Sequence, residues 1–169
     1  FGNKNKNKFF YVIRRSPGSG LFSNLTYVLN HLKIADKYKF IPVVDMENFL
    51  TIYNEDKSIL KTRNAWLYYF EQTSKYSLNE VYSSNKVIIS SNVLKKPFLE
   101  MNKEKSFFYF KKKYIKIKII HLDEAKKFAK KNFKNEKILG VHFRGTTYKT
   151  TRGHAFPSSI KLMIKNVDR

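Results

Sequence analysis

The stretch FFYVIRRSPGSGLFSNLTYVLNHLKIADKYKFIPVVDME, residues 9–47, decides the fold of this chain. Aromatic and β-branched residues predict a strand at 9–14, and the letters SPGSG that follow mark a turn. Apolar residues then recur with helical spacing over residues 21–39, and a second apolar run predicts a strand at 40–44. Strand, glycine-rich turn, helix and strand form a βαβ unit, which predicts an α/β fold with a mainly parallel sheet flanked by helices.

The rest of the chain adds weaker signals. The polar residues 1–8 predict a disordered or frayed start, and residues 9–145 are expected to form one α/β domain. Residues 114–120 alternate with period two but run directly into a stretch with helical spacing. Further elements are expected as a helix at 64–72, a strand at 86–91, a helix around 122–129, a strand at 137–143 and a last helix capped by Ser158 or Ser159.

Composition restricts the class of protein. The chain has 169 residues, 42% of them hydrophobic, which is enough for a packed core. Its formal net charge is +21, which favours nucleic acid, a phosphorylated ligand or an anionic membrane surface as partner. The competing interpretation, a solvated lysine surface without a ligand, is preferred for the lysine clusters at 111–113 and 126–131.

The sequence lacks cysteine and lacks long apolar runs, which excludes some kinds of site and of protein. The chain contains no cysteine, so it has no disulfide, no thiolate nucleophile and no cysteine-based zinc site, and it suits a reducing cytosol. No apolar run approaches the roughly 20 residues that span a bilayer. Peripheral contact with a membrane stays open.

The turn after the first strand is a candidate anion site. Gly18 and Gly20 precede the predicted helix, and Asn24 lies in its first turn. Backbone N–H groups at the start of a helix bind phosphates and carboxylates well. The spacing matches neither G-x-G-x-x-G nor a P-loop, so a plain connection between strand and helix is an equal alternative.

Polar residues also follow the second predicted strand. Asp45, Glu47 and Asn48 lie at its carboxyl end, where ligands bind in open α/β sheets. These side chains could bind the hydroxyls of a sugar, and a carboxylate could act as a base. The alternative is that Asp45 only caps the start of a helix.

The third candidate site is at VHFRGTT, after the last predicted strand. His142 and Arg144 are two residues apart and therefore share one face of that strand. Arg144 can bind two phosphate oxygens at once, Gly145 permits a sharp turn, and Thr146 and Thr147 offer hydroxyls. Too few ligands with metal spacing are present for a metal site. The pattern fits a diphosphate clamp, unless Arg144 merely forms an ion pair with a carboxylate at the edge of the sheet.

These residues resemble a known family. GVHFRG is similar to the H-x-R-x-G motif of GDP-sugar fucosyltransferases: the protein O-fucosyltransferases, the alpha-1,6-fucosyltransferases and the bacterial nodulation fucosyltransferases. GSGLFSN and IPVVDMENFLTIYNE also resemble members of this group. The three matches occur in the expected order, and the resemblance covers residues 11–160.

The resemblance implies a GT-B fold, in which residues 9–145 are the first of two Rossmann-like domains. It also implies an inverting transfer from a GDP-sugar to a glycan or glycolipid acceptor, and no metal. It gives Arg144 the catalytic contact with the diphosphate and places His142 beside the nucleotide. Donor binding is expected from His142, Gly145, Thr146, Thr147, Gly18, Gly20 and Asn24, and acceptor binding from Asp45, Glu47 and Asn48. The location expected for such a protein is the bacterial cytoplasm, including the inner face of the membrane.

The sequence departs from the family in two respects. Thr147 stands where the family often has an acidic residue after R-G-T. A GT-B enzyme also needs a second domain of roughly 100–200 residues, so residues 146–169 are expected to be a linking segment and the start of a donor-binding domain that this chain lacks. The alternatives are a basic nucleic-acid-binding domain, for which no known recognition motif is present, and a non-catalytic interaction domain.

Overall fold

A computed structural model of the chain describes residues 1–15, 20–90, 104–133, 137–140 and 159–167. The chain divides into two compact units, Phe1–Phe128 and Ala129–Arg169. The expected limit of the first domain, after residue 145, falls inside the second unit. Almost all described elements, and the sheet, belong to the first unit.

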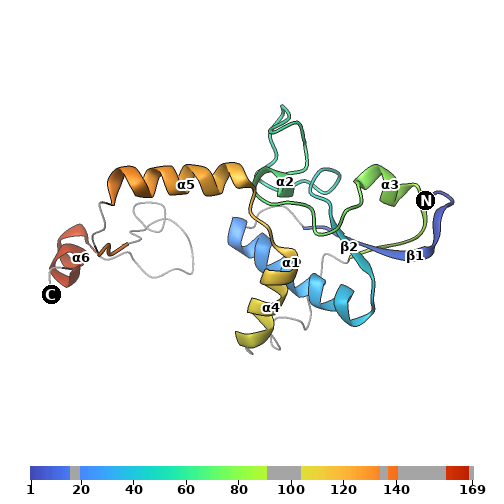
Figure 1. Cartoon of the computed structure of the whole chain (residues 1–169), viewed down its shortest axis with the longest axis horizontal. Helices are drawn as coiled ribbons and strands as arrows, with labels where there is room; N and C mark the ends of the chain where they lie inside the picture. Colours follow the sequence, from blue (N-terminus) through green and yellow to red (C-terminus); the bar gives the residue numbers. More distant parts are fainter. Residues whose placement is uncertain (16–19, 91–103, 134–136, 141–158, 168–169) are drawn as a thin grey trace. The chain divides into compact units, whose positions relative to one another are not determined.

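The first unit is built on a three-stranded parallel sheet (Figure 1). Its strands are β1 (Lys4–Ile13), β2 (Ile41–Val44) and β3 (Ser84–Ile89), in the order β2-β1-β3. The central strand pairs with both neighbours along its carboxyl half, from Phe10 onward. The expected α/β class with a parallel sheet is therefore confirmed for the described residues.

The expectation of a disordered or frayed start is wrong from Lys4 onward. β1 begins at Lys4, which pairs with Ser84, and the Asn5 amide donates a hydrogen bond to the Ser84 hydroxyl over 2.9 Å. The pairing register shifts between Lys4 and Phe9. Strand pairing uses backbone groups, so this polar segment can extend the strand while its lysine side chains remain in solvent.

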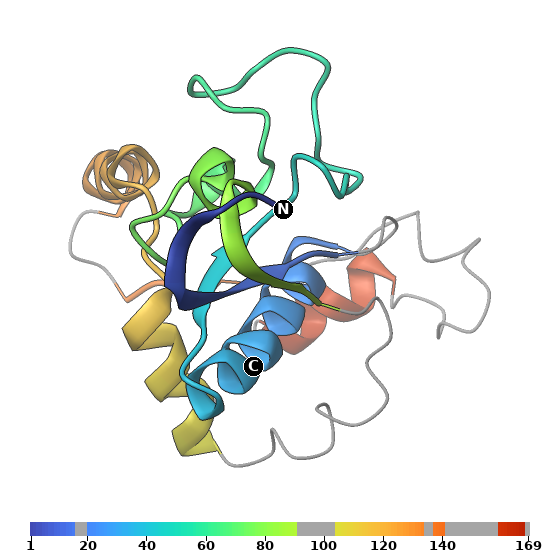
Figure 2. The same ribbon diagram turned by 90° about the vertical axis from the view of Figure 1, so that its right-hand side faces the viewer.

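Helices cover both faces of the sheet, because alternate residues of β1 point to opposite sides. Tyr11 and Ile13 pack with the apolar residues of α1 (Leu21–Lys37) on one face. Phe10 and Val12 pack with Val81 of the short helix α3 (Leu78–Tyr82) on the other. Figure 2 shows α1 lying against the sheet.

Helix lengths differ from the expectations for local reasons. α1 ends two residues early, because Lys39 takes up left-handed backbone with φ of 58°. The expected helix at 64–72 is only α2 (Trp66–Tyr69), because Phe70 is extended and forms a bridge with Ile117. That bridge is the only strand pairing within the alternating segment 114–120 that the structure describes.

Further helices follow β3 in the chain. α4 (Glu104–Tyr114) was not expected; it contacts α1, and the Tyr114 hydroxyl lies 3.1 Å from a carboxylate oxygen of Asp36. α5 (Ile119–Asn132) confirms the predicted helix. In α6 (Ile160–Val167) the Ser159 hydroxyl accepts from the Leu162 amide, as predicted for its cap. Residues 137–140 of the expected strand at 137–143 are irregular, and the remainder lies outside the described residues.

Candidate functional site

The carboxyl ends of the three strands meet at one edge of the sheet, because all strands are parallel. Arg14 follows β1, Asp45 follows β2 and Ser90 follows β3. Ligands of open α/β sheets bind outside this edge. The edge therefore defines the candidate site.

Asp45 is fully buried, and its carboxylate is saturated within the fold. Oδ1 accepts the amides of Glu47 and Asn48, at 3.0 and 2.9 Å. Oδ2 accepts the Asn48 side-chain amide at 2.8 Å and the Tyr82 hydroxyl at 2.6 Å. Burial and the contact with Asp45 raise the pKa of Tyr82, so this phenol stays protonated and donates. Asp45 thus shapes its loop and has no oxygen left over for a ligand. The predicted alternative, a helix N-cap, is wrong because irregular backbone and not a helix follows Asp45, although the carboxylate accepts backbone amides as a cap does.

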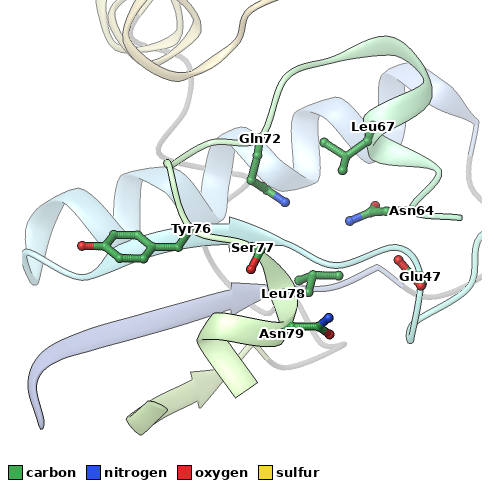
Figure 3. Close-up of a pocket in the computed structure, with 8 residues that line it drawn as sticks. All are labelled: Glu47, Asn64, Leu67, Gln72, Tyr76, Ser77, Leu78 and Asn79. Atoms are coloured by element: carbon green, nitrogen blue, oxygen red, sulfur yellow. The ribbon is translucent and has the colours of Figure 1, made fainter. Parts of the chain in front are cut away.

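Beside this loop lies a cavity of about 260 Å³. Figure 3 shows Glu47, Asn64, Gln72 and Ser77 gathered around one space, with the Tyr76 ring directed away from the others. Glu47 is exposed, and no hydrogen bond or ion pair engages its carboxylate within the described part of the chain. The complete lining is Glu47, Asn64, Leu67, Gln72, Tyr76, Ser77, Leu78 and Asn79.

Two side-chain amides form a fixed wall of this cavity. Asn64 accepts from the Met46 and Trp66 amides and donates to the Val44 carbonyl. Gln72 accepts from the Val44 amide and donates to the Val44 carbonyl, at 2.8 and 3.0 Å. β2 is an edge strand of the sheet, and both side-chain amides bond the backbone of Val44 where a further strand would otherwise pair. The wall is held in place before any ligand arrives, which reduces the entropy lost on binding.

The start of α1 is the second part of the candidate site. Gly20 caps the helix with φ of −64°, and a Cβ there would meet only the Tyr53 hydroxyl at 3.8 Å. Neither backbone strain nor packing therefore requires glycine at this position. The Leu21 amide donates to the Tyr53 hydroxyl over 2.8 Å, and Asn24 is buried at the end of the first turn. Among the described residues only the Tyr53 hydroxyl approaches Gly20, beside the amides of the helix start.

The structure brings the predicted acceptor residues Asp45, Glu47 and Asn48 onto one loop, and Gly20 and Asn24 onto the start of α1. The remaining predicted residues lie outside the described residues: Gly18, His142, Arg144, Gly145, Thr146 and Thr147.

Sequence reasoning missed the cavity residues contributed by α3. Ser77 caps this helix by accepting from the Glu80 amide at 3.2 Å. The sequence Ser77-Leu-Asn-Glu80 matches the S-x-x-E start signal of a helix, which could have located α3. It could not have shown that Ser77 and Asn79 face Glu47, because only the packing of α3 on β1 brings them there.

No protein-family model matches the chain, and no solved structure matches it. An uncharacterized membrane protein, ycf78, from Helicosporidium sp. subsp. Simulium jonesii is 33% identical over 86 residues. This stretch is 50% of the present chain, and the chain spans 7% of that protein. Among the described helices, none is long and apolar enough to cross a bilayer, and the described residues contain no cluster of three potential metal ligands.

Proposed function

We propose that this chain is the first, Rossmann-like domain of a GT-B glycosyltransferase that transfers a sugar, such as fucose, from a GDP-sugar to a glycan. The observation that carries the proposal is the preformed cavity at the carboxyl end of β2. It combines one open carboxylate, from Glu47, with amide and hydroxyl groups and two leucines. Sugar rings present the matching surface, with hydroxyls at the rim and C–H groups on the faces.

The ends of β1 and β2 carry opposite charges and would therefore favour different substrates. Arg14 and Arg15 follow β1 and Glu47 follows β2, so the edge of the sheet is basic at one strand and acidic at the next. A nucleotide diphosphate is favoured by the basic side and a neutral sugar by the acidic one. The parallel order β2-β1-β3 is that of a doubly wound α/β sheet, the broader group of folds with which the Rossmann-like assignment is compatible.

In the proposed reaction, an acceptor hydroxyl oxygen bonds to the anomeric carbon of the donor while the bond from that carbon to the phosphate oxygen breaks. The phosphate oxygen keeps the electron pair and leaves with GDP. The hydroxyl proton passes to a base, for which Glu47 is the candidate in the described residues. Arg144, assigned from the sequence motif, balances the charge that grows on the diphosphate. The competing explanation, an ion pair between Arg144 and Asp45 or Glu47, predicts instead that Arg144→Ala lowers stability and leaves the GDP affinity of the folded protein unchanged.

A ligand-dependent melting experiment tests the nucleotide assignment. In the longer, two-domain protein, GDP should raise the melting temperature where the same concentration of ADP does not, because a ligand of the folded state stabilises it by mass action. Arg144→Ala and Arg144→Lys should both abolish this shift, since a lysine does not reproduce the guanidinium fork. Arg152→Ala is the control for the loss of one charge. Binding to random-sequence DNA that weakens steeply with salt, without a response to GDP, would favour the nucleic-acid alternative.

The cavity is tested by activity. In the two-domain protein, Glu47→Gln should slow transfer from GDP-fucose to a glycan acceptor by about a hundredfold, the effect of losing a general base, while leaving the GDP-dependent melting shift intact. Glu55→Gln, on an exposed loop outside the cavity, is the matched control. Normal transfer by Glu47→Gln would remove Glu47 from the mechanism.

A further inference from the structure

The side chain of Arg14 is fixed between the loops that follow the two outer strands. Its backbone amide donates to the Ser90 hydroxyl at 3.0 Å, and its Nε donates to the Ser90 carbonyl at 2.8 Å. On the β2 side, its guanidinium carbon lies 4.9 Å from the centre of the Phe49 ring. One side-chain hydrogen bond, from Nε, and one ring contact therefore hold the guanidinium, while the backbone bond fixes the strand end from which it projects.

The fixed guanidinium has no acidic partner in the part of the chain that the structure describes. Asp45, the carboxylate at the neighbouring strand end, already accepts four hydrogen bonds from other groups. The contacts of Arg14 use Nε and the ring face, and no described residue accepts from its terminal nitrogens. These two nitrogens form a planar fork that matches two oxygens of a phosphate or carboxylate.

A second arginine, Arg15, follows Arg14 at the same strand end. Its guanidinium carbon is 5.0 Å from the centre of the Tyr27 ring, and both Arg14 and Arg15 act electrostatically on the Tyr27 phenol. Tyr27 packs with the core on the α1 face of the sheet and Phe49 with the core on the other face, so the two arginines contact opposite faces. The carboxyl edge of the sheet, where Arg14 lies, is where ligands of open α/β sheets bind.

We propose that Arg14 is the anchor of an oxyanion-binding site at the carboxyl end of β1, with Ser90 and Phe49 holding its guanidinium in place. The ligand group is a phosphate or a carboxylate. It can belong to the diphosphate of a nucleotide or to an acidic group on a glycan. The inference does not depend on the proposed transfer reaction, because it rests on contacts among described residues of one unit.

The test uses NMR on the 169-residue chain. The side-chain Nε–H signals of arginines are recorded while pyrophosphate, and separately acetate, is added at constant ionic strength. The Arg14 signal, identified by its absence in Arg14→Gln, should shift and saturate, while that of Arg63, an exposed arginine on another loop, should not. A larger response to pyrophosphate points to a nucleotide as the source, and an equal or larger response to acetate points to an acidic glycan.

Two variants of Arg14 test whether it binds an oxyanion through its planar pair of terminal nitrogens or through its positive charge alone. Arg14→Gln should weaken pyrophosphate binding about tenfold or more, the usual effect of losing a charge-assisted contact. Arg14→Lys should also weaken it, because lysine lacks the fork. Arg63→Gln, which removes the same charge elsewhere, should bind as the wild type does. The inference is overturned if Arg14→Gln and Arg63→Gln bind equally, or if the Arg14 and Arg63 signals shift alike without saturation. Circular dichroism of each variant confirms that it is folded.

Discussion

The ends of β1 and β2 lie side by side in the same sheet, yet their charged residues are in opposite situations. After β2, Asp45 is completely buried and all its acceptor positions are occupied by the fold. After β1, Arg14 is half-buried, and its terminal nitrogens face no described carboxylate. The difference shows that a charged residue at a strand end is not identified as a binding residue by its position. It is identified by donor or acceptor atoms that the fold leaves without a hydrogen bond.

The comparison predicts the largest loss of stability for Asp45→Ala. This change leaves the Tyr82 hydroxyl and the amides of Glu47 and Asn48 without their acceptor, and some of these donors can turn to water instead. We expect the free energy of unfolding to fall by about 3–4 kcal/mol. Urea denaturation followed by circular dichroism measures it. A loss below about 1 kcal/mol would show that the carboxylate does not organise the loop.

His31 of α1 is an intermediate case, because only one of its ring nitrogens has a partner. Nδ1 lies 2.7 Å from the Tyr11 hydroxyl, whereas Nε2 is buried without a hydrogen bond. Burial lowers the pKa of His31 to about 4. The unfolded chain takes up a proton near pH 6.5 and the folded chain only near pH 4. Stability should therefore decline by at most about 3 kcal/mol as the pH falls through this window, and level off below it.

A variant isolates this contribution from the other titrating groups. Asparagine at position 31 places a polar atom near the Nδ1 position and does not titrate, so His31→Asn should flatten the pH dependence between 6.5 and 4. His121→Asn is the control, since the His121 side chain is 35% exposed. Denaturant midpoints measured at several pH values check both. An unchanged slope in His31→Asn would assign the acid sensitivity to other residues.

Tyr82→Phe sharpens the comparison on the β2 side. It removes one of the four donors to Asp45 and leaves the others in place. We expect a loss of about 1–2 kcal/mol, because Oδ2 keeps its bond to Asn48. The loss should vanish when Tyr82→Phe is made in the Asp45→Ala background, which a double-mutant cycle measures. Additive effects of the two changes would separate Tyr82 from the carboxylate.

The smallest change in stability is expected for Arg14→Gln. The variant loses the bond from Nε to the Ser90 carbonyl, and a single hydrogen bond of this kind is worth about 1 kcal/mol, so the net loss should lie within about 1 kcal/mol. Thermal unfolding in a chloride buffer without added oxyanion measures it. A loss as large as that of Asp45→Ala would make Arg14 a structural residue and erase the contrast between the two strand ends.

The regular elements around the sheet could be predicted because each has a pattern within its own sequence. The apolar alternation of β1 and the helical spacing of α1 are local, and both were located to within a few residues except at the amino end of β1. That end is polar, and it becomes a strand only because β3 supplies backbone partners. α4 was missed because its aromatic and lysine residues show no clear apolar stripe.

The candidate site was predicted in part. Asp45, Glu47 and Asn48 were recognised from their place after a strand, but the sequence could not distinguish a saturated carboxylate from an open one. Tyr82, which completes the bonding of Asp45, is 37 residues away in the chain. The motif containing Arg144 lies outside the described residues, so its role stays a prediction from sequence.

The sequence by itself determined the α/β class, because the periods of apolar residues and the glycine-rich turn are properties of consecutive residues. Only the tertiary structure decided which polar groups are used up and which are open to a ligand. Hydrogen-bond satisfaction depends on partners brought together from distant segments, as Ser90 and Phe49 are brought to Arg14 and Tyr82 to Asp45.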